Sequence, residues 1–73
     1  TGPVSRGDAG TVAAHLEALS SLRDGEGRRL DDVVASYRQL AAATTERCEA
    51  TGRLAAEQAL RLRELLAPER LGD

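Results

Sequence analysis

The sequence predicts an all-α fold from three observations. Thirteen alanines and eleven leucines dominate the apolar residues, whereas Phe, Trp, Met and Ile are absent, a composition that favours helices over sheets. Apolar residues recur at steps of three and four along two stretches. A Gly-rich loop separates these stretches. We expect a helical hairpin, with a short helix over about 9–23 and a long helix over about 28–66, that dimerises into a four-helix bundle or coiled coil.

Residues 1–8 are expected to form a flexible lead-in, because they are rich in Gly and show no periodicity. Arg6-Gly7-Asp8 spells the integrin-binding tripeptide. The simpler interpretation is that Asp8 caps the helix that follows, since Asp is a preferred N-cap residue.

The first helix follows from its apolar spacing and its end signals. Gly25 and Gly27 suit a helix terminus, and the short loop between the helices predicts an antiparallel hairpin. The apolar face of this helix comprises Ala9, Val12, Leu16, Leu19 and Leu22.

The second stretch keeps a heptad register over five heptads, which is typical of a helix packed along its whole length. Val33, Leu40 and Leu54 widen this stripe on one flank. Pro68 ends the helix, so the single helical domain covers 9–67 and residues 68–73 form a frayed tail. The stripe consists of Leu30, Val34, Tyr37, Ala41, Thr44, Cys48, Thr51, Ala55, Gln58, Leu62 and Leu65.

Gly52 leaves an alternative open. A glycine inside a helix costs about 1 kcal/mol relative to alanine, so residue 52 could instead be a turn in a monomeric three-helix bundle. The register passes through Gly52 without a slip, and Glu49 and Arg53 are spaced to pair across it. These two features favour the continuous helix.

Unequal helix lengths predict an association surface. A helix of ~37 residues spans ~55 Å and one of ~15 residues only ~22 Å, so half of the long helix would lack a partner within the chain. Small residues near its middle would allow another helix to approach closely. The predicted interface comprises Leu30, Val34, Tyr37, Ala41, Cys48, Leu54, Ala55, Leu62, Leu65 and Leu66.

No residue pattern indicates catalysis, a cofactor or a metal. His15 has no metal-ligand companion at helical spacing, and Cys48, the only cysteine, is expected to be a small buried hydrophobe. Tyr37 is expected to anchor the seam. The net charge of −2 is spread evenly, which argues against nucleic-acid binding. No apolar run could span a membrane and no signal peptide is seen, so we expect a cytoplasmic or other intracellular protein.

We therefore expect a non-catalytic oligomerisation or scaffold module, a segment of a larger protein or complex, whose partner is itself or another helical protein and which takes no small-molecule substrate. The alternative is an accessory helical domain, for docking, regulation or dimerisation, of an enzyme or transcriptional regulator. Over residues 9–45, the order of short helix, acidic glycine-containing loop and longer helix is similar to the dimerising docking segments of modular polyketide synthases. The second helix here is longer than in that pattern.

Overall fold

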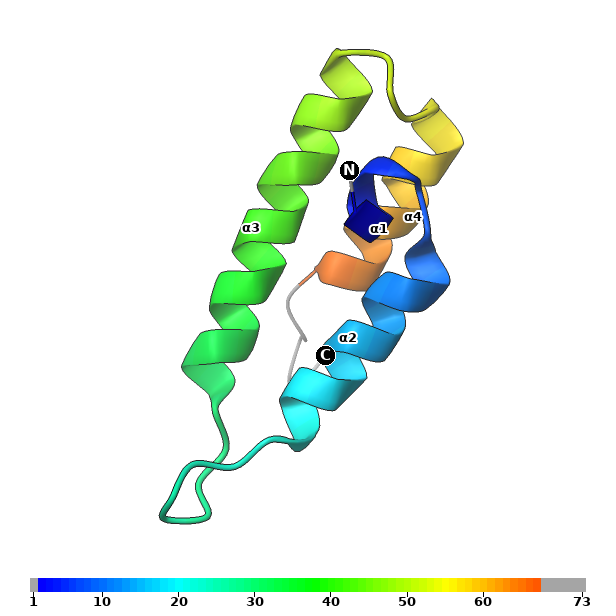
Figure 1. Cartoon of the computed structure of the whole chain (residues 1–73). Coiled ribbons are helices and arrows are strands. Elements are labelled where there is room, and N and C mark those ends of the chain that lie inside the picture. Colours follow the sequence, from blue (N-terminus) through cyan, green and yellow to red (C-terminus); the bar gives the residue numbers. More distant parts are fainter. Residues whose placement is uncertain (1, 68–73) are drawn as a thin grey trace, which may run out of the picture.

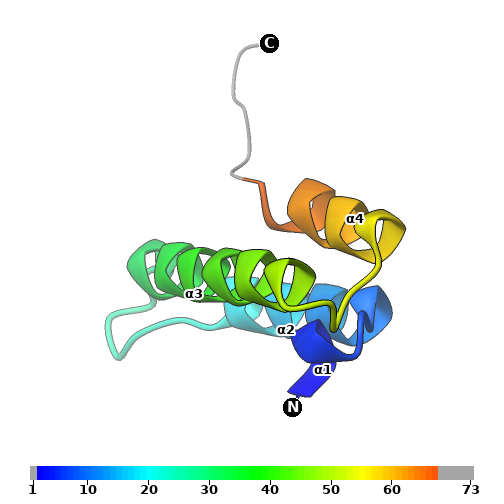
Figure 2. The same ribbon diagram turned by 90° about the horizontal axis from the view of Figure 1, so that it is seen from above.

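A computed structural model describes residues 2–67, and within them the fold is all-helical with no strand. The four helices are α1 (Gly2–Ser5), α2 (Ala9–Ser21), α3 (Asp31–Ala50) and α4 (Ala56–Leu66). In Figure 1, α2 and α4 run in one direction and α3 returns in the other. Figure 2 shows α1 and α4 on opposite sides of the α2–α3 pair. The tail predicted over 68–73 lies outside the described residues.

The first turn of α2 is capped as the sequence predicts. The Asp8 carboxylate accepts hydrogen bonds from the Thr11 amide at 3.1 Å and from the Thr11 hydroxyl at 2.7 Å. This satisfies one of the amides that a helix start leaves unpaired. Residues 2–5, which we expected to be a flexible lead-in, instead form α1, and the Val4 side chain is buried.

The loop between α2 and α3 is organised by one carboxylate. Asp24 Oδ1 accepts hydrogen bonds from the amides of Glu26 and Arg28 at 2.8 and 2.9 Å. Its Oδ2 accepts one from the Arg28 guanidinium at 3.0 Å. These bonds lower the pKa of Asp24, chiefly through the Arg28 amide. The chain therefore reverses here, which confirms the predicted break after the first helix.

The continuous helix predicted over 28–66 is wrong, because α3 ends at Ala50 and a turn follows it. Gly52 has a φ of +80°, a left-handed conformation that glycine adopts without steric cost. The Arg53 amide donates to the Cys48 carbonyl at 2.8 Å, and the Gly52 amide donates to the Glu49 carbonyl at 3.1 Å. This pair of bonds is a Schellman motif, which closes a helix C-terminus. The turn at Gly52 is the one that the alternative architecture required.

The turn folds α4 back against α2 and α3, and the core forms between these helices. Leu62 and Val12 are fully buried, and Leu54 and Leu66 are nearly so. The unpartnered patch expected around Leu54 and Leu66 is therefore not exposed. An ion-pair cluster adds to the α3–α4 contact, because the Arg63 guanidinium pairs with both Glu46 and Glu49. This pairing lowers the pKa of Glu46 and raises that of Arg63.

Candidate association surface

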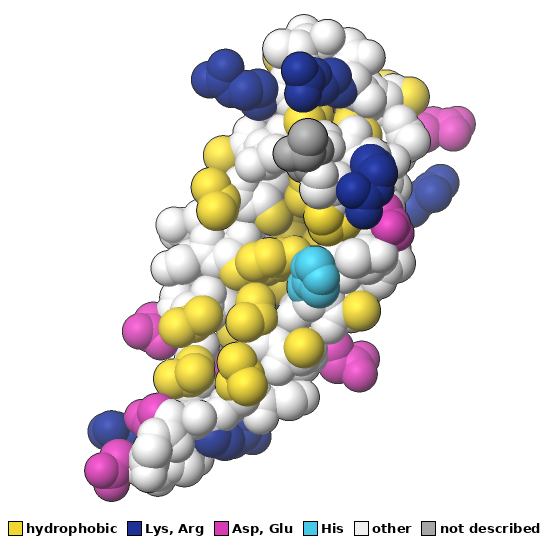
Figure 3. All heavy atoms as spheres, in the orientation of Figure 1, with side chains coloured by type: hydrophobic (Ala, Val, Ile, Leu, Met, Phe, Trp, Pro, Cys, Tyr) yellow, Lys and Arg dark blue, Asp and Glu magenta, His cyan; other side chains and the backbone are white. Residues whose placement is uncertain are grey.

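One face of the α2–α3 pair remains largely uncovered. α4 covers the opposite side, and α1 is too short to cover this one, since four residues rise ~6 Å whereas the twenty of α3 rise ~30 Å. Figure 3 shows hydrophobic side chains gathered over α2 and α3 on this side, around the histidine. We call it the α2–α3 face and define it by His15, Leu22, Val33, Tyr37 and Leu40.

Leu40 is the most exposed large hydrophobic side chain on the described part of the chain. It lies in the middle of α3 and is 71% exposed, and Val33, two turns earlier, is 42% exposed. Leu22, at the end of α2, is 49% exposed. A contiguous apolar surface in contact with water usually marks an association site.

A shallow hollow of about 230 Å³ adjoins Leu40 and is bordered by α1, α2 and α3. At its edge, the Tyr37 hydroxyl and His15 Nδ1 are 3.4 Å apart, and the two rings meet edge-on with centroids 6.3 Å apart. This contact joins the Tyr37 side chain of α3 to the His15 side chain of α2. The hollow is lined by Gly2, Pro3, Val4, His15, Tyr37, Leu40, Ala41 and Thr44.

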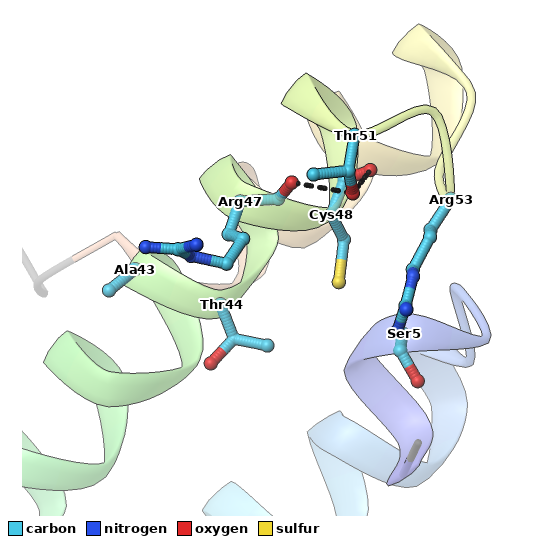
Figure 4. Close-up of a pocket in the computed structure, with 7 residues that line it drawn as sticks. All are labelled: Ser5, Ala43, Thr44, Arg47, Cys48, Thr51 and Arg53. Atoms are coloured by element: carbon cyan, nitrogen blue, oxygen red, sulfur yellow. Dashed lines mark hydrogen bonds between the residues drawn. The ribbon is translucent and has the colours of Figure 1, made fainter.

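A second pocket of about 570 Å³ lies between α1 and the C-terminal half of α3 (Figure 4). The hydroxyls that line it already donate to backbone carbonyls: Ser5 to Gly2, Thr44 to Leu40 and Thr51 to Arg47. The pocket also lies near the C-terminus of α3, which is the negative end of the helix dipole. The groups in this pocket that could bind an anion are therefore the guanidinium groups of Arg47 and Arg53.

Cys48 also lines this second pocket, and its thiol points between α3 and α1 in Figure 4. The side chain is buried, as the sequence predicts, and belongs to the core. The one histidine does not line this pocket. Among residues 2–67, no three or more His, Cys, Asp or Glu side chains group in a way that could hold a metal ion.

The structure divides the ten predicted interface residues into three sets. Leu30, Val34, Tyr37 and Leu65 are half-buried, and Ala55 is exposed. The other five are buried in the chain's own core, namely Ala41, Cys48, Leu54, Leu62 and Leu66.

Sequence reasoning missed the exposure of Leu40 and Val33. Both were placed on one flank of the heptad stripe, as residues that only make the stripe broader. The available signal was their own spacing, because Val33, Tyr37, Leu40 and Thr44 also recur at steps of four and three. Two overlapping stripes on one helix indicate two contact faces.

Comparison with known families gives one match. Residues 1–44 match the family model described as a domain of unknown function, DUF2520. The chain belongs to the DUF2520 family. The matched residues include α1, α2 and α3 as far as Thr44, and thus all five residues that define the α2–α3 face. No curated protein and no solved structure matches this DUF2520 chain.

Between residues 2 and 67, none of the helices combines the length and the hydropathy that crossing a membrane requires.

Proposed function

We propose that this DUF2520 chain is a non-catalytic helical association module that binds another protein through the α2–α3 face. The observation that carries the proposal is Leu40, a leucine exposed over 71% of its surface at the centre of the longest described helix. Covering a leucine contributes ~1.5–3 kcal/mol, so a partner that covers Leu40, Val33 and Leu22 together gains substantial free energy.

The chemistry of this face supports a protein partner. Leu40 and Val33 are apolar, and Tyr37 combines an apolar ring with a hydroxyl, a residue type enriched at protein interfaces. The α3 side chains that point outward from Val33 to Thr44 include Ser36 and Ala43 but no charged residue. A phosphate-rich partner would require arginines at this position.

The turn at Gly52 favours a related function, that of an accessory helical domain whose core closes within one chain. Leu54, Leu62 and Leu66 are covered by the chain itself, so association is not required to bury them. In this case the α2–α3 face attaches the domain to the protein that it serves.

The test is site-specific photo-crosslinking in the cells that produce the protein. A photoreactive residue replaces Leu40 in one variant and Leu60 in the other, because Leu60 is similarly exposed, at 55%, but lies on α4. We expect covalent adducts at position 40 in clear excess over position 60. Equal yields at both positions, or no adduct at position 40, would refute the proposal.

A further inference from the structure

We propose that the partner of the α2–α3 face is a second copy of this chain, with the two α3 helices antiparallel and crossing at Leu40. This inference rests on the function proposed above and names the partner of the same surface. A two-fold contact uses one patch on both copies, so the patch must be complementary to itself. Shape and charge on this face both meet that condition.

The first argument is shape. α1 lies against the C-terminal half of α3 and stands out from the face, whereas the N-terminal half of α3 and the end of α2 are left uncovered (Figures 1 and 2). An antiparallel pair places the α1 of each copy over the uncovered half of the other. A parallel pair places both α1 segments at the same end, and the apolar half that contains Val33 and Leu22 gains no such cover.

The second argument is charge. Val33 and Arg47 each lie seven residues from Leu40, so in an antiparallel pair centred on Leu40 each faces the other across the contact. Asp32 precedes Val33 and lies within about 60° of Arg47 around the helix, hence on the same flank. The contact therefore brings each Arg47 guanidinium beside the second copy's Asp32 carboxylate, twice by symmetry.

Both charged side chains are available for this pairing. Asp32 and Arg47 are exposed, and neither forms an ion pair with any of residues 2–67. In a parallel pair, each Arg47 would lie near the seam at the level of the other Arg47, so these like charges would repel. Each Asp32 would lie about two helix turns from Leu40, on the side away from any Arg47, so neither attractive pair could form. The arrangement of charge therefore selects the antiparallel orientation.

The test is a charge exchange between copies, measured by sedimentation equilibrium over a dilution series. Asp32→Arg and Arg47→Glu each turn both attractive pairs of the homodimer into repulsive ones. We expect each variant alone to dimerise about tenfold more weakly than the wild type, since two surface pairs are reversed. In an equimolar mixture, the heterodimer regains both pairs and is expected to associate as tightly as the wild type.

The matched control mixes Asp32→Arg with Arg61→Glu. Arg61 is also exposed and without an ion pair among the described residues, but it lies on α4. Arg61→Glu alone is therefore expected to dimerise like the wild type. Its heterodimer with Asp32→Arg keeps one attractive and one repulsive pair, so it is expected to associate more weakly than the heterodimer of the first mixture. Circular dichroism of each variant checks that α3 is intact. Recovery in the first mixture can arise only from contact between copies, because folding defects in two separate chains do not correct each other.

The outcomes separate this inference from the proposed function. If the wild-type chain stays monomeric at every concentration, the inference that the partner is a second copy is overturned. Crosslinking at position 40 then still decides whether the α2–α3 face binds another protein. If Leu40→Glu dissociates the dimer but the mixture of Asp32→Arg and Arg47→Glu associates no more tightly than either variant alone, the antiparallel contact at Leu40 is overturned. Dissociation by Leu40→Glu and not by Leu60→Glu, together with recovery in the mixture, supports the proposal.

Discussion

Replacing Gly52 with alanine tests the turn that gives this chain its architecture. Gly52 has a φ of +80°, and a Cβ built on it meets no heavy atom within 4 Å, so the cost of the substitution is conformational and not steric. The left-handed conformation costs an L-residue ~1–2 kcal/mol, and alanine recovers ~0.4–1 kcal/mol by restricting the unfolded chain. We expect a net loss of about 1 kcal/mol in the free energy of unfolding.

Gly25→Ala is the matched control, because Gly25 lies in a loop with open space around it but does not have a positive φ. It is expected to leave stability unchanged or to raise it slightly. Urea unfolding followed by circular dichroism measures both variants, and a loss of 1 kcal/mol corresponds to about 4–8 °C in Tm for a domain of this size. If Gly52→Ala instead stabilises the chain by about 1 kcal/mol, residue 52 is inside a helix and the turn is refuted.

Two further substitutions test the core and the cap of α2. Leu62→Ala removes a fully buried side chain and is expected to cost ~2–5 kcal/mol in urea unfolding, whereas Leu60→Ala, at a 55% exposed position, should change stability by less than about 0.5 kcal/mol. Hydrogen bonds from the Thr11 hydroxyl and amide hold the pKa of the Asp8 carboxyl below its ordinary value of 3.8. The ionised carboxylate therefore stabilises the fold above pH 3.8, and this stabilisation is lost as the pH falls through the folded-state pKa. Asp8→Ala should therefore lower the Tm at pH 7, and the difference from the wild type should disappear in acid; a constant difference down to pH 2 would contradict the capping role.

Local sequence signals predicted the ends of the elements more reliably than periodicity did. The cap at Asp8 and the break after the first helix each depend on one or two side chains bonding to nearby backbone, as Asp8 does to Thr11 and Asp24 to Arg28. Such contacts are encoded within a few residues. The helix predicted over about 9–23 accordingly agrees with α2, Ala9–Ser21, within two residues.

Periodicity failed at Gly52 for a geometric reason. Cys48 is a core residue of α3, and Ala59 is a core residue of α4. They are eleven residues apart, which is close to three full turns of an uninterrupted helix, so both would fall on the same face within about 20°. The turn therefore preserves the phase of the apolar pattern. A heptad count cannot distinguish one long helix from two helices that restart in register.

The buried arc of α3 also differs from the predicted stripe. Thr45, and not Thr44, is fully buried, and its hydroxyl donates to the Ala41 carbonyl at 2.8 Å. This bond satisfies the hydroxyl inside the core, so burial costs little. Hydropathy assigns the two threonines the same value. The choice between them depends on where α4 packs, which is a long-range contact that the sequence pattern does not specify.

The same turn that buries the predicted interface explains why another one is free. With α4 folded back, one side of α2 and α3 is covered by the chain, and the other is left to α1, which is one turn long. Leu40 is thus exposed although the core is complete without it. Leu40→Glu is therefore expected to remove association while leaving stability within about 0.5 kcal/mol of the wild type. With a continuous helix, the dimer interface would itself have been part of the hydrophobic core. A substitution that broke such a dimer would also have reduced the helicity and stability of the chain, so loss of association without loss of stability distinguishes the two architectures.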